Sequence, residues 1–182
     1  MFQTDIIEKC KQHNRKAQLQ LYNQYCDGMF MVANRFVKNS MEAEDIVQEA
    51  FIKAFSKLHQ YSGEVTFGAW LKRIVINKSI DVLKSKKQQL LDLDEVHLKV
   101  VDATNDDWLV DDLITLDEVK EAIEKLPDKY KYVVMLYLIE GYDHQEISQI
   151  LNITEVASRT HLSRGKTKLQ ELLIPLHHGT RS

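Results

Sequence analysis

Apolar side chains recur every three or four residues between Glu42 and Leu58, which predicts an amphipathic helix. They form one wide stripe that suits a buried core: Ile46, Val47, Ala50, Phe51, Ala54, Phe55 and Leu58. A second stripe lies on the opposite side of this helix: Asp45, Gln48, Glu49 and Ile52. A helix that only covers a core needs the first stripe alone. The second, which ends in an apolar residue, therefore indicates a surface that meets a partner.

Helical spacing also dominates the rest of the first half of the chain. It predicts helices over 4–25 and 29–37, with Asn39 or Ser40 as the cap of the Glu42–Leu58 helix. A loop containing Gly63 follows, and the next helix is predicted over 67–85. Its inward residues are expected to be Phe67, Trp70, Leu71, Ile74 and Val75.

The periodicity weakens between residues 88 and 111, where acidic residues dominate. We interpret this stretch as a partly disordered linker, with Trp108 as an apolar residue that docks on a neighbouring domain or contacts a partner. Helical spacing resumes at Leu113 and ends at Pro127, and a further helix is predicted over 132–139, before Gly141. Strand-like alternation is scarce. The chain is therefore expected to be all-α, with two small helical domains at 1–87 and 112–182 joined by an acidic flexible linker at 88–111.

The segment from Asp143 to Leu172 has the pattern of a helix-turn-helix. Asp143 can cap the first helix, Asn152 tolerates the positive φ that the turn needs, and Thr154 can cap the second helix. The second helix is expected to expose basic and small polar residues, a set that can reach base edges and phosphates in a major groove. These residues are Ser158, Arg159, Thr160, His161, Ser163, Arg164, Lys166 and Lys168.

Charge is segregated along the chain although the net charge is only −3. Basic residues prevail between 72 and 87, and acidic residues prevail between 92 and 118, so each block is interpreted separately. Hydrophobic residues make up 44% of the 182 residues, which is enough for a globular core.

Several classes of protein do not fit the sequence. The N-terminus lacks a long apolar run and no stretch is long enough for a membrane span, so a soluble cytoplasmic protein is expected. Cys10 and Cys26 match no zinc spacing, and we expect buried or incidental reduced thiols. No phosphate-binding loop, metal cluster or nucleophile–base pair is visible. We therefore expect no enzyme activity, no cofactor, no metal and no small-molecule substrate.

In this order, these segments resemble the extracytoplasmic-function group of bacterial RNA polymerase sigma factors, from about residue 19 to residue 172 apart from the linker. Residues 43–55 (AEDIVQEAFIKAF) resemble the core-binding helix of region 2.2. Residues 67–81 (FGAWLKRIVINKSID) resemble the promoter-melting and −10 helix of regions 2.3 and 2.4. Residues 123–169 resemble the −35-binding region 4.

The resemblance implies a role for each set of residues. Asp45, Gln48, Glu49 and Ile52 would bind the clamp coiled coil of the largest polymerase subunit. The loop residues Tyr61, Ser62, Gly63 and Glu64 would form a pocket for a flipped −10 base. Phe67, Trp70 and Asn77 would support or line that pocket, and Lys72, Arg73 and Lys78 would hold phosphates. The −35 element would meet Ser158, Arg159, Thr160, His161, Arg164, Lys166 and Lys168. Implied partners are core polymerase, through its clamp and flap, promoter DNA and an anti-sigma factor.

The chain departs from the family pattern in the second helix of the helix-turn-helix. The family often has Gly-Thr-Val where this chain has Val156, Ala157 and Ser158, so the −35 preference is not inherited and looser helix packing is expected. Ser148 replaces the Ala that the family prefers at the helix crossing. For the acidic linker, a path along the basic RNA exit region and a solvated spacer both stay open.

Two other functions fit the sequence less well. An ordinary helix-turn-helix regulator has no need for the Asp45, Gln48, Glu49 and Ile52 face. A helical protein–protein adaptor predicts no basic helix between Arg159 and Lys168.

Overall fold

The computed structural model describes residues 2–88 and 114–178, with side chains described for 5–87 and 114–174. The described elements are all helices, and no strand occurs in either range, which confirms the all-α prediction. The chain divides into two compact units, before and after residue 94. The predicted linker at 88–111, its acidic residues and Trp108 fall almost wholly outside the described residues, and the predicted domain boundaries stay predictions.

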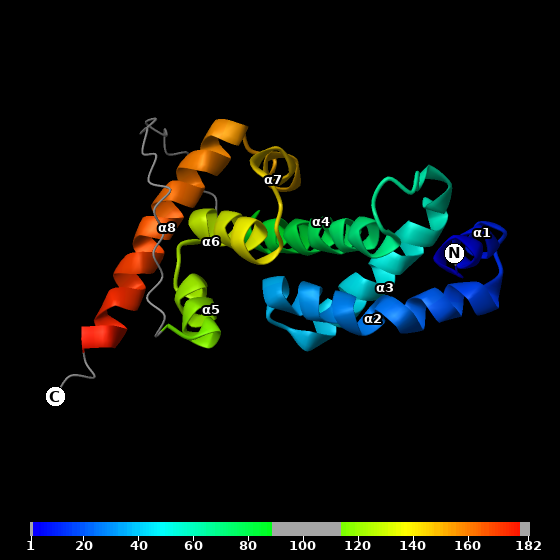
Figure 1. The fold of residues 1–182 in the computed structure, drawn as a ribbon, viewed down its shortest axis with the longest axis horizontal. Helices are drawn as coiled ribbons and strands as arrows, with labels where there is room; N and C mark the ends of the chain where they lie inside the picture. Colours follow the sequence, from blue (N-terminus) through cyan, green and yellow to red (C-terminus); the bar gives the residue numbers. More distant parts are fainter. Residues whose placement is uncertain (1, 89–113, 179–182) are drawn as a thin grey trace. The chain divides into compact units, whose positions relative to one another are not determined.

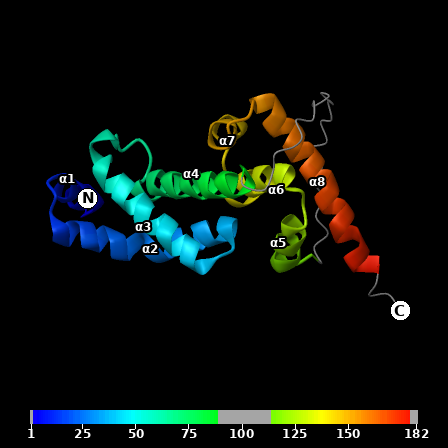
Figure 2. The same cartoon turned by 180° about the vertical axis from the view of Figure 1, so that it is seen from behind.

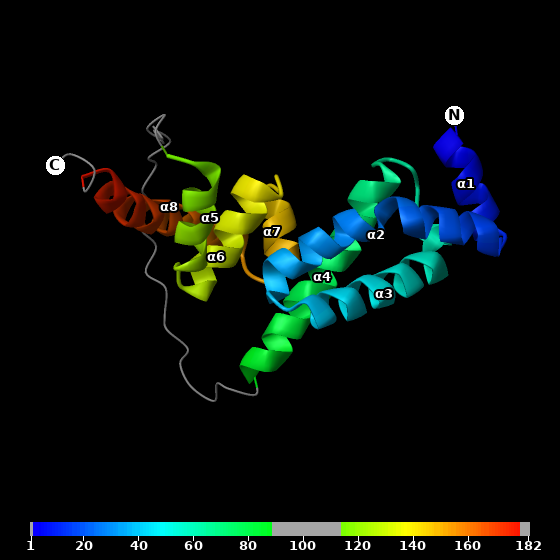
Figure 3. The same ribbon diagram turned by 90° about the horizontal axis from the view of Figure 1, so that it is seen from below.

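The first unit is built on three long helices: α2 (Arg15–Val37), α3 (Ser40–Ser56) and α4 (Phe67–Gln88). Each packs against the other two, and the short helix α1 (Phe2–Lys11) lies against α2 (Figures 1 and 3). The side chains of their shared core are completely or almost completely buried: Leu21, Ala33, Val47, Ala50, Phe51, Phe67, Leu71 and Val75. A 3₁₀ turn, Leu58–Gln60, leads from α3 into the loop before α4.

The prediction of separate helices over 4–25 and 29–37 was wrong. The break lies earlier, where His13 has a φ of 59° and the Asn14 side chain accepts a hydrogen bond from the backbone N–H of Ala17 at 3.1 Å. From there α2 is continuous through Gly28, which is exposed. Gly28 costs only about 1 kcal/mol in a helix interior, and the buried residues on either side of it offset that cost.

The α-helices in the described part of the second unit are α5 (Leu116–Glu124), α6 (Asp128–Val134), α7 (His144–Leu151) and α8 (Glu155–His178). The long helix α8, orange to red in Figure 2, contacts α5, α6 and α7. A π-helical turn, Met135–Ile139, continues α6, and Gly141 with a φ of 77° follows it. The helix predicted over 132–139 is therefore present and ends where predicted, but it begins earlier, at Asp128, and its last part has the wider turn.

Candidate functional site

The two faces predicted for the helix α3 are present. Its inner face is buried against α2 and α4, whereas Asp45, Gln48, Glu49 and Ile52 are all exposed. Ile52 is 70% exposed, so a bulky β-branched side chain faces water beside three polar ones. The buried core of the unit does not include this second face. We call it the α3 outer face.

An open groove of about 390 Å³ lies beside the α3 outer face, between α3 and α4. Its lining mixes acidic, basic and apolar groups: Glu49, Ala50, Ile52, Lys53, Ser56, Ile74, Lys78 and Asp81. Across it, Lys78 of α4 forms an ion pair with Glu49 of α3. Residues that the sequence assigned to two different partners therefore touch each other in the free chain.

The loop before α4 is held by its own contacts. The Tyr61 hydroxyl donates a hydrogen bond to the carbonyl oxygen of Val65 at 2.6 Å, and Gly63 has a φ of 81°, which favours glycine. The Ser62 hydroxyl accepts from the backbone N–H of Glu64 at 3.4 Å. Ser62, Gly63 and Glu64 are exposed, so the loop presents its polar groups outward over a fixed backbone.

Three aromatic rings anchor this loop to α4. The ring centroids of Tyr61 and Trp70 lie 5.3 Å apart, and each lies 5.9 Å from the centroid of Phe67. Tyr61 and Trp70 are half-buried and each keeps part of its ring accessible, whereas Phe67 is fully buried. Phe67 is buried as expected of an inward residue, so of the two roles implied for it, supporting or lining the pocket, its position fits the supporting one.

Further along α4, the three basic residues expected to hold phosphates, Lys72, Arg73 and Lys78, are half-buried, as is Asn77, which was expected to support or line the pocket. They follow Trp70 on the same helix, so positive charge continues directly from the aromatic cluster. A second interhelical pair, between Lys86 and Glu42 at 2.5 Å, ties the end of α4 to the start of α3.

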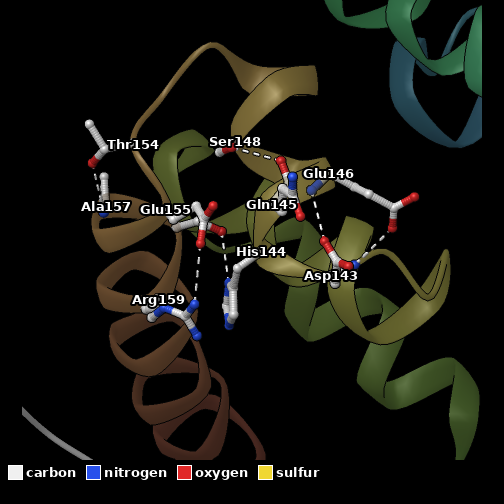
Figure 4. A network of polar contacts seen from close by, with 10 residues as sticks. Asp143, His144, Gln145, Glu146, Ser148, Thr154, Glu155, Ala157 and Arg159 are labelled. Atoms are coloured by element: carbon white, nitrogen blue, oxygen red, sulfur yellow. Dashed lines mark hydrogen bonds and ion pairs between the residues drawn. The ribbon is translucent and has the colours of Figure 1, made fainter.

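The helix-turn-helix is formed as its sequence predicted (Figure 4). The Asp143 side chain accepts from the backbone N–H of Glu146 at 2.8 Å, and the Glu146 side chain accepts from that of Asp143 at 3.1 Å. This reciprocal capping gives hydrogen-bond partners to two backbone N–H groups that have none within the helix. Asn152 has the expected left-handed conformation with a φ of 56°, and the Thr154 hydroxyl caps α8 through the N–H of Ala157 at 3.1 Å.

Five of the residues predicted on α8 for DNA are accessible. Arg159 and Lys168 are exposed, and Thr160, Arg164 and Lys166 are half-buried. Arg159 forms an ion pair with Glu155 at 3.3 Å (Figure 4). The ammonium group of Lys166 lies 5.7 Å from the centroid of the Tyr137 ring, which keeps this lysine close to the surface of the unit.

The prediction that Ser158 and His161 face DNA was wrong. Ser158 is fully buried, with its hydroxyl oxygen 2.9 Å from Nδ1 of His144, so it joins α7 to α8. His161 is 8% exposed and packs edge-on against Tyr130, and its Nε2 has no hydrogen-bond partner among the described residues. Burial, then the nearby Lys129 and Arg164, hold the pKa of His161 below its ordinary value.

The cause of that error is the register of the helix. Ser158 and His161 fall on the stripe that continues through Leu162, Gly165 and Leu169, all of them buried. The polarity of Ser158 and His161 suggested a surface position. Their helical spacing to Leu162 and Leu169 could have shown that they face inward.

Two residues that were not assigned to DNA contact lie beside the predicted DNA face. Val156, on the first turn of α8, is 56% exposed among polar neighbours. His144 stacks on Tyr137 with ring centroids 5.1 Å apart and bonds to Ser158. Burial, then the charge of Arg159, lowers the pKa of His144. An apolar residue on an otherwise polar face was the available signal for Val156.

Other kinds of site are not indicated within the described ranges. No group of three or more His, Cys, Asp and Glu side chains there could hold a metal ion, and no helix among them is long and apolar enough to cross a membrane. Cys10 and Cys26 are both free thiols, and burial raises the pKa of each.

Both units match known protein families. The family described as Sigma-70 region 2 matches residues 21–89, and that described as Sigma-70, region 4 matches residues 116–169. The ECF RNA polymerase sigma factor SigW of Bacillus subtilis is 31% identical over 176 residues, which cover 92% of this chain and 94% of the relative. The ECF RNA polymerase sigma-E factor of Haemophilus influenzae is 26% identical over 182 residues, with 94% and 95% covered.

Solved structures share the fold at lower identity. CnrH, solved in complex with the cytosolic domain of CnrY, has a TM-score of 0.56 at 21% identity, covering 95% of this chain and 97% of that one. The sigma factor RpoE, solved with the anti-sigma factor NepR from Bartonella quintana, has a TM-score of 0.55 at 22% identity, covering 85% and 94%. Both regions match in order and a relative above 30% identity spans nearly the whole chain, so this protein belongs to the extracytoplasmic-function (ECF) group of sigma-70-family RNA polymerase sigma factors.

Proposed function

We propose that this chain is a promoter-specificity subunit of bacterial RNA polymerase. It binds the core enzyme, recognises −35 and −10 elements and promotes opening of the DNA near −10. The observation that carries this proposal is an exposed α3 outer face, which lies outside the buried core, in the same unit as the Tyr61–Trp70 cluster and the basic part of α4. A separate helix-turn-helix supplies the second contact with DNA.

Core binding is assigned to the α3 outer face. Asp45 and Glu49 give it negative charge, and Ile52 supplies exposed apolar area beside the groove. A basic, amphipathic helical partner complements both features, and the clamp coiled coil of the largest polymerase subunit is the partner that we assign. Region 4 would meet the flap of the polymerase.

Opening at −10 is assigned to the loop of residues 61–66 and to α4. Melting a duplex exposes bases that need new stacking partners, and stacking on an aromatic side chain is worth about 1–3 kcal/mol per base. Tyr61 and Trp70 offer partly accessible rings for this purpose. Extruding one base costs a few kcal/mol, which the exposed polar groups of Ser62, Gly63 and Glu64 would offset by hydrogen bonds. Lys72, Arg73 and Lys78 would then hold the displaced backbone, while Asn77 would support or line the base pocket.

Recognition at −35 is assigned to the exposed side of α8, with Arg159, Thr160, Arg164, Lys166 and Lys168. The solved relatives carry the cytosolic domain of CnrY and the anti-sigma factor NepR. We therefore include an anti-sigma factor among the partners of this chain. The proposal gives the protein a place in the bacterial cytoplasm, where promoters are transcribed. It assigns no covalent reaction to the chain.

Transcription in vitro tests the proposal. Core polymerase is incubated with total genomic DNA from the source bacterium, with and without the protein, and the RNA 5′ ends are sequenced. We expect new 5′ ends that share motifs near −35 and −10 and appear only when the protein is present. Identical 5′ ends with and without the protein would contradict the proposal. Duplex binding without core, and no new 5′ ends, would instead indicate an ordinary helix-turn-helix regulator.

A further inference from the structure

The side of α8 that faces away from the core of its unit has an apolar centre. Ser158, Leu162 and Leu169 are buried and mark the inward side. At 3.6 residues per turn, the opposite side is centred on Val156, Thr160, Ser163 and Thr167. Val156 is 56% exposed although it is the most apolar of these four.

Threonine hydroxyls on this side are already bonded to the helix itself. The Thr160 hydroxyl donates to the carbonyl oxygen of Val156 at 2.9 Å, and the Thr167 hydroxyl donates to that of Ser163 at 3.2 Å. Because the hydroxyl proton is already used in this bond, it is not available to donate to DNA. The methyl group is then the part of the threonine that can make an apolar contact. Val156 and Thr160 lie one turn apart, so they present neighbouring methyl groups at the N-terminal end of α8.

Arg159 borders this apolar centre. Its side chain is 63% exposed and is paired with Glu155, whose side chain is 47% exposed. Exposed pairs of this kind are weak, so the guanidinium group can leave Glu155 for a base edge. In a helix-turn-helix the N-terminal residues of the second helix contact base edges in the major groove. The only apolar group that a base pair displays there is the C5-methyl of thymine.

We propose that Val156 reads a thymine of the −35 element through its C5-methyl group, next to a base that Arg159 contacts. The inference rests on the proposed function of the helix-turn-helix. It makes Val156 a specificity-determining residue and explains why an exposed valine is tolerated in a polar surface. Thr160 extends the same apolar contact by one turn.

The test uses holoenzyme assembled from core polymerase and the full chain. Promoter DNA is first selected from a randomised duplex library, and each thymine of the selected −35 element is then replaced singly by deoxyuridine, which lacks only the methyl group. At one position, we expect the affinity of the wild-type holoenzyme to fall about fourfold, the factor for one buried CH₂-sized group. With Val156→Ala, which keeps only one methyl group, the preference for thymine over uracil at that position should become clearly smaller.

Ile174→Ala is the matched control, because Ile174 is also a β-branched residue on α8 and is 55% exposed. It lies 18 positions further along, about 27 Å at 1.5 Å per residue, and should preserve the full thymine preference. A thymine-to-uracil ratio that is the same in wild type and Val156→Ala at every −35 position would overturn the inference and leave the proposed function intact. Failure of the holoenzyme to enrich any −35 element would overturn both.

Discussion

Gly165 lets α8 approach α6 closely, and replacing it with alanine should loosen the second unit. A Cβ atom at this position would lie 2.6 Å from Cγ2 of Val134 and 3.3 Å from Cβ of Tyr130. Ordinary contacts of a Cβ atom lie at 3.4–4 Å. The new methyl group would therefore lie nearly 1 Å nearer to Cγ2 of Val134 than an ordinary contact allows. Val134 is fully buried and β-branched, so it has little freedom to turn away.

The expected cost follows from two opposing effects. Overpacking in a well-packed core costs about 1–3 kcal/mol, and the stiffness of Val134 favours the upper part of this range. Alanine gains about 1 kcal/mol over glycine in helix propensity. The net loss for Gly165→Ala should therefore be about 1–2 kcal/mol, located in the second unit.

Gly28→Ala is the matched control, since Gly28 also lies inside a helix but its Cβ would meet nothing within 4 Å. It should stabilise the first unit by about 0.5–1 kcal/mol. Amide hydrogen exchange followed by mass spectrometry reports the stability of each unit separately, because each unit yields its own peptides. The two units then need not be treated as one unfolding transition. Protection of α6 and α8 should fall in Gly165→Ala. An increase in protection there, like that expected of α2 in Gly28→Ala, would refute the close-packing argument.

Three more predictions concern the caps, the loop and pH. Asp143→Ala should destabilise the second unit by about 1 kcal/mol, because the cap on the N–H of Glu146 is lost, while Gln145→Ala should change little; thermal denaturation measures both. Tyr61→Phe removes the bond to Val65, so hydrogen exchange in the loop of residues 61–66 should become faster while α3 keeps its protection. The second unit should lose stability as the pH falls below about 6.5, the ordinary pKa of histidine, because the unfolded chain then binds protons that folded His161 and His144 resist. His161→Phe should weaken this dependence in denaturation curves recorded across that pH range, and an unchanged curve would argue against His161 as a cause.

Features set by local periodicity were the ones the sequence could predict. The apolar stripe of α3 repeats at helical spacing, so both the buried face and the α3 outer face follow from it. Caps and turn residues are similarly local, and Asp143, Asn152 and Thr154 adopt the conformations expected of them.

Features set by contacts between distant segments were harder to predict. Two helices were predicted on either side of residues 26–28, but α2 stays continuous there because α3 and α4 pack along it. Ser158 and His161 have polar side chains, yet α8 turns both inward and Ser158 finds its partner on α7. The burial of Ser158 with a hydrogen bond also differs from the looser packing expected at that position.

The pairing of Glu49 with Lys78 was not predictable from either helix alone. Each residue fitted a separate role, and only the packing of α3 on α4 brings their charges together. An interaction that depends on how two helices cross cannot be predicted from the spacing of residues along either helix.

The division of α3 into a folding face and a docking face is tested most directly by co-migration with core polymerase on gel filtration. The wild-type chain should elute with core, and the double variant Asp45→Arg with Glu49→Arg should elute alone while its helical circular-dichroism signal stays unchanged. A control with the same charge change and spacing, Asp117→Arg with Glu121→Arg on α5, should still elute with core. Co-migration of the Asp45 and Glu49 double variant as strong as that of wild type would contradict the assignment.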